Sequence, residues 1–207
     1  MTTQAFPALE RLQERAEPRQ NSVIERVAES RKTHDLLVKA LGTIGFSAIW
    51  GLCAGSAKPM MALANVYKVP MVIALALVVS LPAVLVTRHL LRIELPPRDI
   101  AGALIVSLFR ASLVLLGVAP LLGVYAYTTQ FIAPLLAQGS AFLALAVGGF
   151  ALQTELRRLP APPRQLFVLG LVCVGVLALS LLQLITLATP VLTLPTAFGG
   201  GIEGMLQ

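Results

Sequence analysis

Five long apolar stretches separated by short polar turns are the feature that most limits what this chain can fold into. Each stretch is close to or above the ~20 residues that an α-helix needs to cross the ~30 Å hydrocarbon core of a bilayer. Backbone polar groups in hydrocarbon must be satisfied within each segment, which favours helices. We expect an all-α, polytopic integral membrane helix bundle with spans over Leu36–Gly55, Val69–Leu90, Ala101–Tyr127, Phe131–Gln153 and Gln165–Thr189.

The composition supports a membrane protein with one folded domain. Apolar residues make up 57% of the 207 residues and charged residues 13%, against about 45–50% and about 25% in soluble proteins. We expect a cytoplasmic polar tail with an amphipathic helix over residues 1–35, a transmembrane bundle over 36–190, and a flexible outer-side tail over 191–207.

The polar tail contains a helix start signal. Ser22 and Glu25 have capping-box spacing, which satisfies backbone N–H groups at a helix N-terminus. The residues that follow mix both charge signs with apolar positions, a pattern suited to the membrane interface or to a partner protein. A solvated extension of the first span explains the same pattern.

The segment 51–70 turns the chain back between the first two spans. Pro59 and Pro70 bracket apolar residues at helical spacing, which predicts a short interfacial helix. Lys58 and Lys68 are expected to anchor it at the lipid headgroups. The alternative for residues 51–56 is an unwound hinge that lines a cavity, because irregular backbone at membrane depth needs protein or water cover.

Two helix faces carry small residues every four positions, and such faces let membrane helices approach closely. We expect them to form packing seams, either with each other or between subunits. The residues are Ser47, Gly51 and Gly55 in the first span and Ser140, Ala144 and Gly148 in the fourth.

Prolines are expected to kink two spans. Pro82 and Pro120 lie deep within the second and third spans, and each removes a backbone hydrogen bond to the preceding turn. A structural kink and a functional gate are the two interpretations.

Arg110 is the one charged residue within the third span. If the helix enters the membrane at Ala101, Arg110 lies near the midplane, where an ionised residue is functional by default. If it enters near Ala111, Arg110 caps the cytoplasmic edge. Because no carboxylate occupies another predicted span, we expect a buried Arg110 to use backbone carbonyls, glutamines, a lipid phosphate or another subunit.

Basic residues predict the orientation. Of 16 Lys and Arg residues, seven precede or enter the first span, three lie over residues 88–98 and three over 157–164, all expected on one side. The positive-inside rule then predicts a cytoplasmic N-terminus and, after five crossings, an outside C-terminus, in what we expect is a bacterial inner membrane.

Residues 45–125 carry a resemblance to a group of proteins. The sequences Lys68-Val69-Pro70, Leu81-Pro82 and Leu116-Gly117-Val118-Ala119-Pro120 resemble uncharacterised bacterial polytopic membrane proteins, loosely related to the Yip1-like superfamily. The resemblance implies a five-helix membrane fold without known catalytic residues, whose eukaryotic relatives act in membrane traffic through protein partners.

The sequence contains no enzyme motif in a suitable context and no paired intramembrane carboxylates or histidines. We therefore expect no enzymatic activity, no cofactor, no metal and no nucleic-acid binding. The partners expected are membrane lipids and either further copies of the chain or other membrane subunits. Two hypotheses follow: a non-enzymatic membrane subunit or scaffold that acts through helix–helix and protein–protein contacts, and a small transporter or channel with proline-kinked helices.

Overall fold

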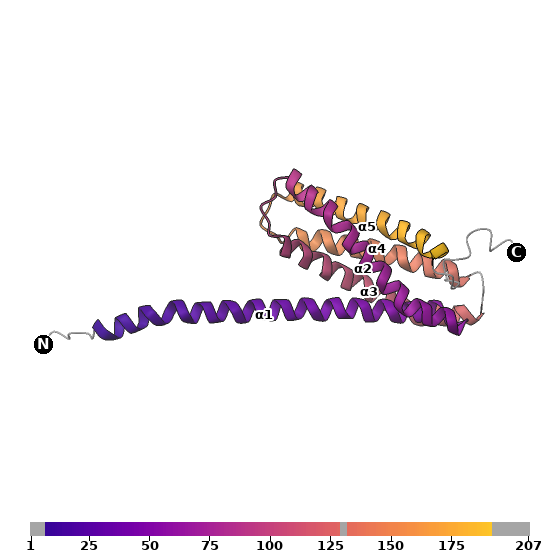
Figure 1. Cartoon of the computed structure of the whole chain (residues 1–207), viewed down its shortest axis with the longest axis horizontal. Coiled ribbons are helices and arrows are strands. Elements are labelled where there is room, and N and C mark those ends of the chain that lie inside the picture. The colour runs from indigo at the N-terminus through magenta and orange to yellow at the C-terminus, as the bar shows by residue number, and fades with distance from the viewer. Residues whose placement is uncertain (1–6, 129–131, 192–207) are drawn as a thin grey trace. The chain divides into compact units, whose positions relative to one another are not determined.

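The computed structural model describes the backbone of residues 7–128 and 132–191, and the side chains of residues 29–128 and 132–183. Within these ranges the regular structure is five helices, each with a segment long and apolar enough to cross a membrane. They are α1 (Pro7–Ala54), α2 (Pro59–Leu90), α3 (Pro97–Thr128), α4 (Ile132–Leu156) and α5 (Pro163–Val191) (Figure 1). The predicted all-α, five-span membrane fold is confirmed.

The chain divides into two compact units, residues 1–38 and residues 39–207. In the first unit the described backbone is helical from Pro7 onward, and residues 29–35 are exposed. The helix start predicted at Ser22 is therefore wrong, because Ser22 lies inside α1. The second unit is the bundle, which contains the last part of α1 and all of α2 to α5. Most of the predicted outer-side tail, residues 192–207, lies outside the described residues.

Proline and the polar turns determine where helices begin and end. Helices α2, α3 and α5 each have proline as their first residue, where its missing N–H costs no helical hydrogen bond. Helix α2 ends in a Schellman motif, in which Ile93 N–H donates to the Arg88 carbonyl and Arg92 N–H to the His89 carbonyl. Arg92 takes the left-handed conformation there, with φ 51°.

The predicted short interfacial helix is wrong as a separate element. Residues 59–68 are helical, but they form the first turns of α2, which continues through Pro70 and Pro82 to Leu90. A proline in a membrane helix is tolerated because surrounding groups satisfy the backbone carbonyl it frees. The hinge proposed for residues 51–56 is also not observed, since α1 remains helical through Ala54.

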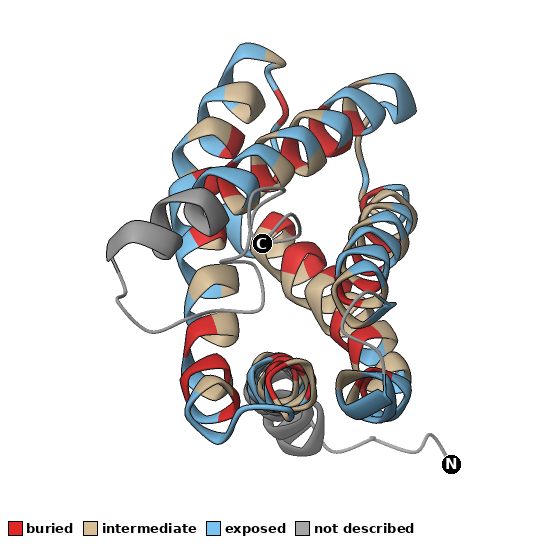
Figure 2. Cartoon of the chain, turned by 90° about the vertical axis from the view of Figure 1, so that its right-hand side faces the viewer, coloured by how far each residue is buried: buried red, intermediate tan, exposed pale blue. Residues whose placement is uncertain are grey.

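Helices that lie far apart in the sequence pack side by side in the bundle. Helix α3 packs along α4, while α5 packs against both α2 and α4. Buried and exposed positions alternate along the described part of each helix, so each helix has a covered side and an uncovered side (Figure 2). One apolar cluster includes Val84, Leu104, Leu156 and Leu169, near the ends of α2 and α4 and the starts of α3 and α5. A second cluster surrounds Trp50.

The last turns of α1 pack closely on α2. A Cβ atom at Gly51 would lie 2.5 Å from the Asn65 carbonyl oxygen, and one at Gly55 would lie 2.6 Å from the Ala62 nitrogen. Only a residue without a side chain allows the two backbones to come this close. On α4, a Cβ atom at Gly148 would lie 3.1 Å from the Ala111 Cβ of α3.

Both small-residue faces therefore make contacts within the chain. The first meets α2 and the fourth-span face meets α3. A hydrogen bond from Trp50 Nε1 to Ser140 Oγ, at 3.1 Å, connects α1 to α4. Ser47, Ser140 and Ala144 are all buried. Pro82 and Pro120 lie on exposed faces of continuous helices, and their kinks stay predictions.

We predict that Gly51→Ala destabilises the bundle, because the added methyl group forces two backbones apart. Overpacking of this kind costs about 1–3 kcal/mol. The matched control is Gly45→Ala in the same helix, where an added Cβ meets nothing within 4 Å. Thermal unfolding in mild detergent should show a lower melting temperature for Gly51→Ala alone. Equal stability of the two variants would contradict the close contact.

Candidate functional site

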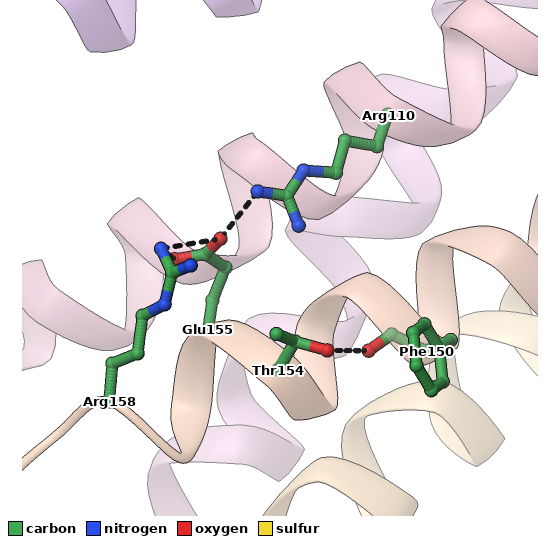
Figure 3. Close-up of polar contacts among 5 residues, drawn as sticks. All are labelled: Arg110, Phe150, Thr154, Glu155 and Arg158. Carbon is green, nitrogen blue, oxygen red and sulfur yellow. Dashed lines mark hydrogen bonds and ion pairs between the residues drawn. The ribbon is translucent and has the colours of Figure 1, made fainter.

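Arg110, Glu155 and Arg158 form a charged cluster in the bundle (Figure 3). Arg110 is on α3, Glu155 is in the last turn of α4, and Arg158 is in the turn that follows. Arg110 Nη2 donates to Glu155 Oε1 at 2.7 Å. Arg158 Nη1 donates to both carboxylate oxygens of Glu155, at 3.2 and 3.4 Å.

The register of α3 against α4 explains why Arg110 reaches Glu155. Gly148 lies beside Ala111, so Glu155, two turns further along antiparallel α4, lies nearer the N-terminal end of α3. Side chains in a helix lean toward its N-terminus. The guanidinium of Arg110 is therefore directed toward the end of the bundle where α4 stops.

This pairing corrects one expectation about Arg110. The sequence places no carboxylate in another span, because Glu155 reads as part of a polar turn; the structure instead extends α4 to Leu156. The Arg110 side chain keeps 40% of its surface exposed, and Glu155 keeps 15%. Arg110 is thus neither buried in the protein nor without a counter-ion, and its charged end lies at the level of the last turn of α4.

A sequence signal for Glu155 exists. It lies seven residues after Gly148, so it continues the α4 face that begins with Ser140 and Ala144. That face packs on α3, as the contact of Gly148 with Ala111 shows. A carboxylate at a helix C-terminus also opposes the helix dipole, and the two arginines offset that unfavourable placement.

Lys68 does not lie where the sequence predicts. Its side chain is buried, at 4% exposed, and Asn65 one turn earlier is also 4% exposed. The prediction that Lys68 contacts lipid headgroups is wrong, because Lys68 lies on the covered face of the first turns of α2, together with Ala64 and Asn65. Lys58, by contrast, is exposed at the start of α2.

Most buried hydroxyl groups bond within their own helix. Ser107, Ser112 and Ser140 donate to carbonyls three residues earlier in the chain. Such bonds satisfy the hydroxyl without a partner helix. These serines therefore serve as small packing residues, while Ser140 also accepts the bond from Trp50.

Gln153 connects α4 to α5. Its Nε2 donates to the Phe167 carbonyl at 3.2 Å, and its amide lies against Gly170. Its Oε1 is buried with no hydrogen-bond partner in the described part of the chain. Gln153 does not contact Arg110 among the hydrogen bonds of these residues, although the sequence offers it as a partner.

Among the described residues no group of three or more His, Cys, Asp or Glu side chains is placed to hold a metal ion. His34 and His89 are both exposed. The chain matches no protein-family model, no curated protein and no solved structure. The likeness to the Yip1-like superfamily remains a prediction.

We predict that Arg110 and Glu155 are energetically coupled. A double-mutant cycle of Arg110→Gln and Glu155→Gln should give a coupling free energy of about 1 kcal/mol. This value is at the upper end of the range for exposed ion pairs, because the apolar surroundings screen the attraction less than water does. The quantity measured is the unfolding free energy in detergent. The matched cycle with Arg157→Gln should give no coupling, and similar couplings in both cycles would contradict the observed geometry.

Proposed function

We propose that this integral membrane protein is a non-enzymatic subunit or scaffold that acts through helix–helix and protein–protein contacts. It is proposed to lie in a bacterial inner membrane with the N-terminus in the cytoplasm and the C-terminus outside, as its basic residues favour. The proposed partners are further copies of the chain or another membrane subunit. The likeness to the Yip1-like superfamily agrees with a partner-dependent role.

The observation that carries the proposal is the exposed helical segment at residues 29–38. It contains Glu29, Arg31, Lys32 and Asp35 and runs without interruption into the first span. Isolated helices are marginally stable in water and gain most of their stability from packing. A charged helix fixed to a membrane span is therefore suited to bind another helix of matching charge pattern.

The small-residue faces pack within the chain, and this supports residues 29–38 as the partner site. Gly51, Gly55 and Gly148 already pack against neighbouring helices of the same chain. In the proposal, the bundle holds the span of α1 in place and residues 29–38 contact the partner.

We expect the full-length protein to migrate in mild detergent as a homo-oligomer or with a stoichiometric partner. Replacing Arg31 and Lys32 with Glu should dissociate that complex, because it reverses two charges on the contacting helix. Lys58→Glu, at the exposed position that precedes α2, is the control and should leave the complex intact. Native mass measurement reports the outcome, and a wild-type monomer without a partner would refute the proposal.

A small transporter or channel is the second candidate, and the burial of Lys68 favours it. Ionisable residues within spans commonly line substrate or proton paths, and Lys68 and Asn65 occupy adjacent turns of α2. The same preparation distinguishes the two functions when it is reconstituted in liposomes. A transporter loses flux in Lys68→Met while its oligomeric state is unchanged, whereas a scaffold shows no flux to lose.

A further inference from the structure

The charged cluster at the end of α4 contains more positive charge and more hydrogen-bond donors than its carboxylate can satisfy. Arg110 and Arg158 carry two positive charges against one negative charge on Glu155. A guanidinium has five N–H donors. Arg110 uses one nitrogen, Nη2, to bond Glu155, and it has no other hydrogen-bond or ion-pair partner within the described residues.

The bundle covers the Arg110 side chain only in part. Arg110 belongs to an apolar membrane span, Pro97–Thr128, and 40% of its side-chain surface is uncovered by protein. Unpaired donors are costly in hydrocarbon, and long basic side chains respond by extending toward the lipid headgroups. The Arg110 side chain extends toward the end of α4, which is the direction expected for the headgroups.

A phosphate group would supply the negative charge and the hydrogen-bond acceptors that the cluster lacks. Arginine binds phosphate through paired N–H donors in a fixed fork. One phosphodiester carries one negative charge and would neutralise the cluster. Arg158 is 68% exposed in the turn after α4, so it can reach the same group from the headgroup side.

The surface next to Arg110 favours a lipid as the source of this phosphate. One turn further into the span, Leu113 is 43% exposed, and at Gly117 an added Cβ meets nothing within 4 Å. An acyl chain can lie along this apolar, open strip of α3 while its phosphate contacts Arg110. A free phosphate ion gains nothing from the strip.

We propose that Arg110 and Arg158 bind the phosphodiester of an anionic glycerophospholipid at the end of α4. Glu155 is the positioning residue, since it holds both guanidiniums at one point. The site is independent of the partner contact proposed for residues 29–38. The site should prefer a lipid with net negative charge over a zwitterionic lipid, because the ammonium group of the zwitterionic headgroup restores the positive charge.

The test is a titration of the full-length protein with phosphatidylglycerol, followed by native mass spectrometry in detergent. Wild type should retain one such lipid per chain in preference to phosphatidylcholine. Arg110→Gln and Arg158→Gln should each weaken retention by about fivefold, the contribution of one basic residue near a membrane surface. Arg157→Gln is the matched control, because Arg157 is exposed in the same turn and takes no part in the cluster.

Several outcomes would overturn the site. Equal loss in Arg157→Gln would mean that general surface charge attracts the lipid. Equal retention of phosphatidylcholine would exclude an anionic lipid as the ligand. So would displacement of the lipid by an equimolar amount of inorganic phosphate, because the apolar strip of α3 should favour the lipid. If Arg110→Gln fails to fold, Arg110→Lys decides: it keeps the charge but loses the fork, so it should still weaken retention, and unchanged retention would refute the role of Arg110.

Discussion

Close approach of helix backbones is the constraint on which this bundle depends. Lipid chains are as apolar as leucine, so burying apolar surface contributes little to the association of membrane helices. Van der Waals packing between the helices must provide the attraction. Gly51 and Gly55 allow α1 to meet α2 at distances that no side chain permits. Trp50 packs in an apolar cluster with Leu115 of α3 and Ala144 of α4 and donates a hydrogen bond to Ser140 of α4, so α1 contacts α2, α3 and α4.

The apolar bilayer also determines where the polar side chains of the bundle form their hydrogen bonds. Buried serines return their hydrogen bonds to their own helices, which leaves them free to act as small spacers. The partly exposed Arg110 extends toward the end of α4, where Glu155 accepts its hydrogen bond. Lys68 is the exception, because it is buried in the first turns of α2. In a small transporter the Lys68 amine would line the substrate path, whereas in a membrane subunit it would have a structural role alone.

Local sequence was sufficient to predict the five spans, because a run of about 20 apolar residues has few alternatives in a bilayer. It failed at Pro70, where a proline that ends a helix in water lies inside α2. That error also misplaced Lys68, since a separate surface helix would have exposed it. Glu155 was missed as the partner of Arg110 because their contact depends on the register of α3 against α4. Such a register is a tertiary property, although the spacing of Glu155 from Gly148 carried a signal for it.

The packing of one face of the α1 span against the other helices of its chain is tested most directly with the single tryptophan of the protein. Trp50 is 2% exposed, so its fluorescence in liposomes should be quenched only weakly by brominated acyl chains and by aqueous iodide. A Trp50→Phe, Leu113→Trp variant gives the lipid-facing reference, because Leu113 is 43% exposed. We predict strong bromine quenching for the reference and weak quenching for wild type. Equally strong quenching of Trp50 would show that the Trp50 face of α1 is open to lipid and would contradict the packing described.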